Sequence, residues 1–261
     1  MEVIEKNGKR IMVLNYNDKL NYDDLEEFKN TRGIGIIHAS TGHENVPKLA
    51  CKQLGLQQEW LSGYSTSSVV ELALLLTLLA SRTQKLVSKT DLSHNFCFKK
   101  GTELKDKNAV VIGSLGRIGS ELVSVLDSLG MIVFKYDSKK ILGFSESLLL
   151  TILNKADFVY LCVNGEDNKH FFSREYFLAC KKQPVLINLV RGTLINEKLL
   201  VEALNKKWIS SYYVDDLLRP RFHDSLNVFY TTHHGANTIE SRERQAIGVR
   251  KLINQMFMPK K

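Results

Sequence analysis

The stretch AVVIGSLGRIGSEL, at residues 109–122, contains the strongest structural signal in the chain. Residues 109–113 form an apolar run typical of a buried strand, and the glycine-containing turn after it opens an amphipathic helix over 117–129. Gly116 allows the backbone to approach a pyrophosphate, and Gly119, three residues later, allows helix and strand to pack closely. The helix N-terminus presents N–H groups and a positive dipole end to phosphates. The stretch therefore predicts a phosphate loop, and the lack of a following Gly-Lys-Ser/Thr excludes a Walker-type loop.

Two further residues, Ser114 and Asp137, affect how the loop is interpreted. Ser114 stands where the pattern G-x-G-x-x-G has its first glycine, so the loop alone is also compatible with a purely structural turn. Asp137 ends the next predicted strand, eighteen residues after Gly119. A carboxylate there accepts hydrogen bonds from an adenosine ribose and repels a 2′-phosphate. The order strand, loop, helix, strand and acid predicts a dinucleotide site that prefers NAD, with NADP as the alternative because Lys139 and Lys140 follow the acid.

From residue 109 onward, short apolar runs alternate with amphipathic stretches. This alternation predicts an α/β fold with a doubly wound parallel sheet and right-handed crossovers. The predicted strands are 109–113, 131–136, 157–163, 184–190, 209–214 and 227–231, and the predicted helices are 117–129, 145–155, 172–181 and 196–206. Ligands of such sheets bind at the carboxyl ends of the strands. Arg191, which directly follows the apolar run 185–190, is therefore expected where a ligand binds.

The first hundred residues predict a second unit with its own strands and helices. The predicted strands are 10–15 and 34–38, and the predicted helices are 22–30, 45–54 and 67–89, with a further helix at 238–257. Residues 88–104 are expected to connect this unit to the parallel sheet.

Composition and charge are those of an ordinary globular protein, with 44% hydrophobic and 25% charged residues. No apolar run reaches the ~20 residues of a membrane span, and the first residues lack the apolar core of a signal peptide, which predicts a cytoplasmic protein without membrane contact. The four cysteines have no metal-ligand spacing and are interpreted as free thiols. The formal net charge of +8 comes from scattered lysines, so nucleic-acid binding is not expected, whereas anionic small ligands are compatible with it.

Six motifs in one order make the chain resemble the D-isomer-specific 2-hydroxyacid dehydrogenase family over most of its length. They are STSSVVELALLLTLLASR (65–82), GTELKDKNAVVIGSLGRIG (101–119), ADFVYLCV (156–163), INLVRGTLINEKLLVEAL (187–204), YYVDD (212–216) and TTHHGANT (231–238). The first resembles the interdomain helix of the family, and the second resembles its cofactor loop. The motifs are specific as a set, whereas any one of them alone would not be.

The resemblance implies a Rossmann-type cofactor domain at 89–235, inserted in a smaller flavodoxin-like α/β substrate domain formed by 1–88 and 236–261. It also implies a homodimer that transfers a hydride between NAD(H) and a small anionic 2-keto or 2-hydroxy acid, of the glyoxylate, hydroxypyruvate, glycerate or phosphoglycerate class.

The resemblance also assigns roles to three side chains. Arg191 matches the clamp that binds the substrate carboxylate and keto oxygen, for which a planar and permanently charged guanidinium is suited. His233 matches the proton donor to the keto oxygen. Asp215 matches an aspartate near the nicotinamide carboxamide. The alternatives are an arginine paired with an acid at a domain boundary, an ordinary loop histidine and a strand-end cap.

The remaining implied contacts lie along the two domains. The cofactor is expected to contact Ser114, Gly116, Arg117, Ile118, Asp137, Val163, Asp215 and His233, and the substrate is expected to contact Ser40, Thr41, Gly42 and Arg191. A simple turn is the alternative for 40–42. No metal is expected, because the adjacent His233 and His234 lack a third ligand.

One residue of the family pattern is missing. The histidine is normally oriented by a glutamate just before a proline, but Arg219 precedes Pro220 here, and Asp216 and Asp224 are the nearest acids. Loss of a carboxylate that fixes the tautomer would weaken proton donation. The alternative function is therefore an NAD(H)-binding sensor or interaction protein with an impaired active site. A methyltransferase with the same kind of loop is disfavoured, because Arg191 and His233 occur in the order of the dehydrogenase family.

Overall fold

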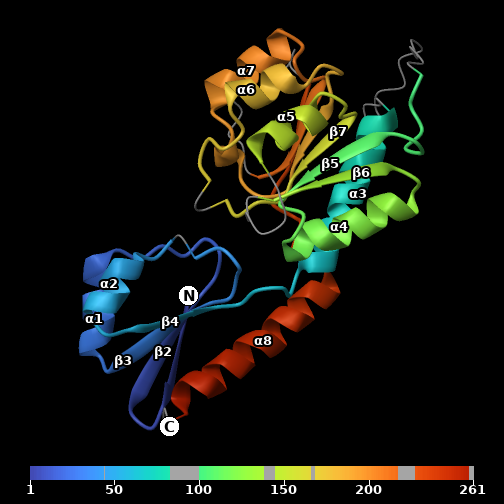
Figure 1. Cartoon of the computed structure of the whole chain (residues 1–261). Helices are drawn as coiled ribbons and strands as arrows, with labels where there is room; N and C mark the ends of the chain where they lie inside the picture. The colour runs from blue at the N-terminus through green and yellow to red at the C-terminus, as the bar shows by residue number, and fades with distance from the viewer. Residues whose placement is uncertain (44, 83–99, 138–144, 166–167, 217–226, 259–261) are drawn as a thin grey trace, which may run out of the picture. The chain divides into compact units, whose positions relative to one another are not determined.

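The computed structural model describes residues 1–43, 45–82, 100–137, 145–165, 168–216 and 227–258 (Figure 1). The chain divides into two compact units. The smaller unit consists of Met1–Ser65 and Ala236–Lys261, and the larger unit of Thr66–Gly235.

The larger unit is built on a parallel sheet of six strands in the order β10-β9-β8-β7-β5-β6. The strands are β5 (Asn108–Ile112), β6 (Ile132–Tyr136), β7 (Phe158–Leu161), β8 (Val185–Asn188), β9 (Ser211–Asp215) and β10 (Val228–Thr231). Each lies close to a strand that the sequence predicts, because these runs are apolar and bounded by turns. The prediction of an α/β fold with a doubly wound parallel sheet is confirmed.

Helices cover both faces of this sheet (Figure 1). The helices α5 (Glu146–Leu153), α6 (Arg174–Ala179) and α7 (Glu197–Asn205) share one core with alternate strand residues such as Val110 and Ile112. The helices α3 (Thr66–Arg82) and α4 (Arg117–Ser128) share the other core with the intervening residues Ala109 and Val111. The alternation follows from the two-residue period of a strand.

The helix α3 differs from the expected division of the chain. The family resemblance implies that residues up to 88 belong to the smaller domain, whereas Thr66 onward belongs to the larger unit. The reason is that Val70, Ala73 and Leu76 are buried in the core shared with α4. The described part of α3 reaches Arg82. Residues 83–99, which include the end of the predicted helix 67–89 and most of the predicted connection 88–104, lie outside the described residues.

The smaller unit has a mixed sheet of four strands in the order β1-β2-β3-β4. These are β1 (Glu2–Lys6), β2 (Lys9–Leu14), β3 (Gly33–His38) and β4 (Gln57–Trp60), of which β1 runs antiparallel to β2. The helices α1 (Tyr22–Asn30) and α2 (Lys48–Gln53) pack on one face, and α8 (Ile239–Phe257) packs on the other through Met256. The antiparallel β1 makes this sheet mixed, and neither β1 nor β4 was predicted.

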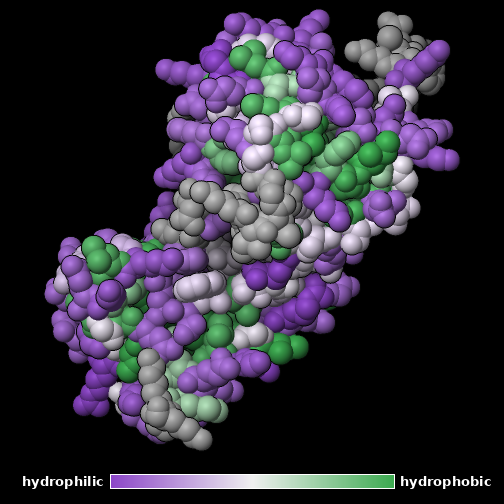
Figure 2. Space-filling view, viewed as in Figure 1, coloured by the Kyte–Doolittle hydropathy of each residue, from purple (hydrophilic) through white to green (hydrophobic). Residues whose placement is uncertain are grey.

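Hydrophilic residues cover most of the surface visible in Figure 2, and hydrophobic residues appear there in smaller separate areas. Among the described helices, none is long and apolar enough to cross a membrane. Cys51, Cys162 and Cys180 are free thiols, and Cys97 lies outside the described residues. The part of the chain that the structure describes contains no group of three or more His, Cys, Asp or Glu residues placed to hold a metal.

Candidate functional site

The sheet order of the larger unit reverses direction at β5, between β6 and β7. The chain passes from β5 to its neighbour β6 on one side and then to β7 on the other side of β5. The connections after β5 and β7 lead to helices on opposite faces, α4 and α6, and open α/β sheets bind ligands at the carboxyl ends of such strands. The two loops touch at Gly113, where an added Cβ atom would lie 2.7 Å from the backbone carbonyl of Cys162. With a φ of +90°, this position favours glycine for two reasons.

The glycine loop leads directly into α4. Gly116 is the N-cap of this helix and provides no side-chain capping bond, so the first-turn N–H groups are not satisfied by the cap. A Cβ atom at Gly119 would lie 2.1 Å from the carbonyl oxygen of Gly113, so the helix packs directly on the loop. Arg117 is exposed, and Ile118 packs against the core between α4 and the sheet. The loop therefore has the close packing that the glycine spacing predicts.

Asp137 lies beside this loop at the end of β6. Its Oδ2 atom accepts a hydrogen bond of 3.1 Å from the backbone N–H of Leu115. The backbone N–H of Ser114 donates to the carbonyl oxygen of Tyr136 at 3.1 Å, so the ends of β5 and β6 are tied together. Ser114 and Asp137 are both buried. Lys139 and Lys140 lie outside the described residues.

Arg191 is presented by a residue that the sequence interpretation passed over. Asn188, the last residue of β8, is fully buried. Its Nδ2 atom donates to the carbonyl oxygen of Arg191 at 2.7 Å and to the hydroxyl of Tyr212 at 2.8 Å, while its Oδ1 atom accepts from Val190 N–H at 3.0 Å. Burial raises the pKa of Tyr212, so this network stays neutral. A lone asparagine in an apolar strand was the available signal, because buried polar side chains need partners.

The stem of the Arg191 side chain packs on the loop after β7. An added Cβ atom at Gly165 would lie 2.8 Å from Cγ of Arg191 and 2.8 Å from Cγ1 of Val190. The guanidinium of Arg191 is half-buried and donates through Nη1 to the Val190 carbonyl at 2.9 Å. Val163, two residues before Gly165, packs against the core on the α5–α7 side. Gly165 thus makes room for the arginine, a role the sequence interpretation missed.

Asp215 organises the turn that carries His233. Its Oδ1 atom accepts from the hydroxyl of Thr231 at 2.6 Å and from His234 N–H at 2.8 Å, and its Oδ2 atom accepts from Gly235 N–H at 2.8 Å. A carboxylate offers about four acceptor positions, so three are used within the turn and about one is left for a ligand. Asp215 has enough acceptor positions both to cap the end of β9 and to make the predicted ligand contact.

His233 itself has a left-handed backbone, with a φ of +58°. Its Nδ1 atom lies 3.2 Å from the backbone carbonyl oxygen of Asp215. Because a carbonyl oxygen only accepts hydrogen bonds, this contact favours the tautomer that carries the proton on Nδ1. Asp216 is one of the two acids nearest to the position of the missing glutamate. Its Oδ2 atom accepts a hydrogen bond of 2.7 Å from Gly192 N–H. Arg219, Pro220 and Asp224 lie outside the described residues.

The other predicted substrate residues form a tight loop in the smaller unit, after β3. The hydroxyl of Ser40 donates to the carbonyl oxygen of Gly42 at 2.7 Å, and Nδ1 of His43 lies 3.3 Å from the carbonyl oxygen of Thr41. The ring of His43 stacks on Trp60 of β4 with a centroid separation of 4.4 Å. The loop is therefore braced by its own bonds and by an aromatic stack from the neighbouring strand.

A family model for the NAD binding domain of D-isomer specific 2-hydroxyacid dehydrogenases matches residues 71–235. The D-3-phosphoglycerate dehydrogenase of Methanocaldococcus jannaschii is 29% identical over 272 residues, covering 98% of this chain and 51% of that protein. The chain thus spans about half the length of this relative. The hydroxypyruvate reductase of Thermotoga maritima is 28% identical over 261 residues, covering 95% of this chain and 83% of that protein.

Two solved structures share the fold. The apo-structure of D-lactate dehydrogenase from Escherichia coli has a TM-score of 0.80 at 24% identity, covering 94% of this chain and 82% of that one. An acyclic imino acid reductase in complex with NADPH and D-Arg has a TM-score of 0.80 at 22% identity, covering 94% of this chain and 81% of that one. At these identities, the likeness shows the fold alone.

Proposed function

Because the chain belongs to the D-isomer specific 2-hydroxyacid dehydrogenase family of NAD-binding oxidoreductases, we propose that it interconverts a small 2-keto acid and its 2-hydroxy acid. One observation carries the proposal. Two consecutive carboxylates at the end of β9 hold the two turns that bear the chemistry: Asp215 binds the turn of His233, and Asp216 binds Gly192, next to Arg191. An acid substrate would thus meet a fixed cation and a proton donor at one edge of the sheet.

The proposed roles follow from the chemistry of each side chain. The guanidinium of Arg191 binds the substrate carboxylate and keto oxygen and so holds the carbonyl in a fixed orientation. His233 donates a proton from Nε2 to the keto oxygen in reduction and accepts it in oxidation. Ser40, Thr41 and Gly42 bind the substrate carboxylate through backbone N–H groups. When bound, the nicotinamide supplies or accepts the hydride.

The residues of the β5–α4 loop fit a dinucleotide. The first turn of α4 has no side-chain cap, and Gly116 and Gly119 put no side chain at the N-cap and at the third position of the helix. Arg117, Ile118 and Val163 are the other proposed contacts. We propose NAD rather than NADP, because a 2′-phosphate would approach the buried carboxylate of Asp137.

The substrate class and the assembly also belong to the proposal. The names of the relatives include phosphoglycerate dehydrogenase, hydroxypyruvate reductase and glyoxylate reductase, which supports a small anionic acid of two or three carbons. We assign the cofactor to the larger unit and the Ser40–Gly42 loop to substrate binding, and we propose a homodimer. Sedimentation at several concentrations tests the dimer.

A substrate panel tests the activity. Oxidation of NADH and of NADPH is followed with glyoxylate, hydroxypyruvate, pyruvate and phosphohydroxypyruvate from pH 5 to 8. Arg191→Lys keeps the charge but loses the planar fork, and should lower kcat/KM by about 10–150-fold. Arg174→Lys makes the same exchange on the exposed α6 and should leave kcat/KM unchanged. His233→Gln should lower kcat by about 10²–10⁴-fold. If none of these acids is turned over with either cofactor, the proposed activity is wrong.

A second candidate is an NAD(H)-binding sensor with an impaired active site. It is favoured by Arg219, which precedes Pro220 at the position where the family pattern has the glutamate that orients the histidine. Calorimetric binding of NADH, together with a trace turnover that Arg191→Ala and His233→Ala leave unchanged, would support this candidate over the enzyme.

A further inference from the structure

The hydroxyl of Ser114 is buried and has no hydrogen-bond partner among the residues that the structure describes. The residue is 4% exposed, and its Oγ atom contacts no donor or acceptor in the described part of the chain. Buried hydroxyl groups are nearly always hydrogen-bonded, and an unmet one destabilises the folded state. A ligand that supplies an acceptor at this position would therefore satisfy the hydroxyl.

The position of Ser114 indicates which partner that is. The residue occupies the first glycine place of the loop, directly after Gly113 and two residues before the N-cap Gly116. The backbone N–H of its neighbour Leu115 donates a hydrogen bond to Asp137, the residue proposed to bind the ribose. A Cβ atom at Gly119 would lie 3.0 Å from the Cα atom of Ser114, so the first turn of α4 lies directly against it. Ser114 thus stands between the acid and the helix N-terminus.

The backbone of Ser114 is already committed to the fold. Its N–H group donates to the carbonyl oxygen of Tyr136, which joins the loop to β6. Of the two hydrogen-bond donors of Ser114, the hydroxyl is therefore the one left for a ligand. A hydroxyl in this place adds a donor that a glycine at the same position cannot provide, and donors to charged phosphate oxygens form the stronger kind of hydrogen bond.

We propose that the Ser114 hydroxyl donates a hydrogen bond to the ribose–phosphate part of the bound dinucleotide. This inference rests on the proposed function. It makes Ser114 a binding residue whose hydroxyl costs stability in the free protein and is satisfied only in the complex. Removing the hydroxyl should therefore have opposite effects on the two states: the free protein gains stability, and the complex loses affinity.

The test measures both states for one variant. For Ser114→Ala, thermal unfolding of the free protein should occur at or above the wild-type Tm, while the Kd for NADH, measured by calorimetry, should rise about tenfold or more. ADP-ribose, which lacks the nicotinamide, should lose affinity by the same factor. Ser114→Gly completes the glycine pattern and should lose as much affinity, since it also lacks the hydroxyl.

Ser241 provides a matched control, because it is fully buried and its Oγ atom also lacks a partner among the described residues. Ser241→Ala should likewise keep or raise Tm but leave the Kd for NADH unchanged. An unchanged Kd in Ser114→Ala or Ser114→Gly would overturn the proposal, and so would a lowered Tm of free Ser114→Ala, which would mean a partner inside the protein. If the wild-type chain binds neither NADH nor NADPH, the proposed function fails instead.

Discussion

The side-chain amide of Asn188 donates a hydrogen bond of 2.7 Å to the backbone carbonyl of Arg191, three residues later. The same side chain accepts from Val190 N–H, so it closes the turn at the end of β8 from both sides. A fully buried asparagine therefore determines where the backbone of the proposed substrate clamp lies. The charge of Arg191 acts on a ligand, but its position is set by a neutral residue.

Replacing Asn188 with leucine should damage both folding and substrate binding. The change leaves Val190 N–H and the Arg191 carbonyl without their partner, which should lower the free energy of unfolding by about 2–4 kcal/mol. The KM for the keto acid should rise about tenfold because the turn loosens. Tyr212→Phe removes only the third bond of Asn188 and should cost about 1 kcal/mol with KM unchanged. Urea unfolding and steady-state kinetics measure the two effects. A wild-type KM in Asn188→Leu would show that the turn holds its shape without the amide.

Gly165→Ala should impair the enzyme more than its stability. The nearest atoms to the added methyl group are side-chain atoms of Arg191 and Val190, so these side chains should shift while the fold is retained. A displacement of the guanidinium by about 1 Å can lower kcat/KM about 10²-fold. Gly130→Ala, at a φ of +75° before β6 at the opposite edge of the sheet, should cost about 1 kcal/mol without changing kcat/KM. If both variants lose only stability, Gly165 does not position the arginine.

The sequence predicts the larger sheet well and the smaller one incompletely, for a physical reason. Central strands such as β5 and β8 are covered on both faces and therefore appear as uninterrupted apolar runs. The edge strands β1, EVIEK, and β4, QQEW, are exposed or half-buried and carry charged or amide side chains, so no apolar pattern marks them. The allocation of α3 was not predictable, since an apolar helix does not indicate which core it joins.

The candidate site divides in the same way. Arg191, Asp137 and Gly119 could be placed from the sequence because parallel strands end at one edge of a sheet. The supporting residues Asn188 and Gly165 could not, because their roles depend on contacts that form only when neighbouring strands pair. The roles that the family resemblance assigns to Arg191 and His233 stay predictions until kinetics test them.

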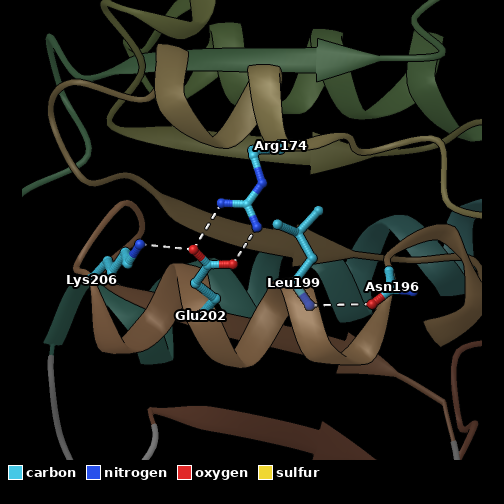
Figure 3. A network of polar contacts seen from close by, with 5 residues as sticks. All are labelled: Arg174, Asn196, Leu199, Glu202 and Lys206. Carbon is cyan, nitrogen blue, oxygen red and sulfur yellow. Dashed lines mark hydrogen bonds and ion pairs between the residues drawn. The ribbon is translucent and has the colours of Figure 1, made fainter.

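A surface ion-pair network should make stability depend on acid pH. Arg174 of α6 and Lys206, just after α7, both bind Glu202 (Figure 3), and the bonds from Arg174 and then Lys206 lower the pKa of Glu202 to about 2. Because the folded pKa lies below the usual 4.5, Glu202 contributes its stabilisation above about pH 4.5 and loses it as the pH falls toward 2.

Glu202→Gln should therefore lower Tm at pH 7 in low salt and have little effect near pH 2. Salt should reduce the difference, because the pair is exposed. Glu121, on α4, forms no ion pair with the described residues. Glu121→Gln is therefore the control and should change Tm little at either pH. Scanning calorimetry at several pH values measures these Tm values. If the Tm of Glu202→Gln is lowered equally at every pH, the loss comes from packing and not from charge.

Asp215→Asn should separate the structural and chemical parts of the His233 turn. The new amide places a donor where an oxygen now accepts from Thr231, His234 or Gly235, so at least one bond of the turn is lost. The free energy of unfolding should fall by about 1–3 kcal/mol. Because His233 is then misplaced, kcat should fall about 10²-fold. Thr231→Val removes a single bond and should cost about 1 kcal/mol with kcat within a few-fold of wild type. If Asp215→Asn keeps the wild-type kcat under saturating cofactor, the carboxylate stabilises the fold and does not position His233.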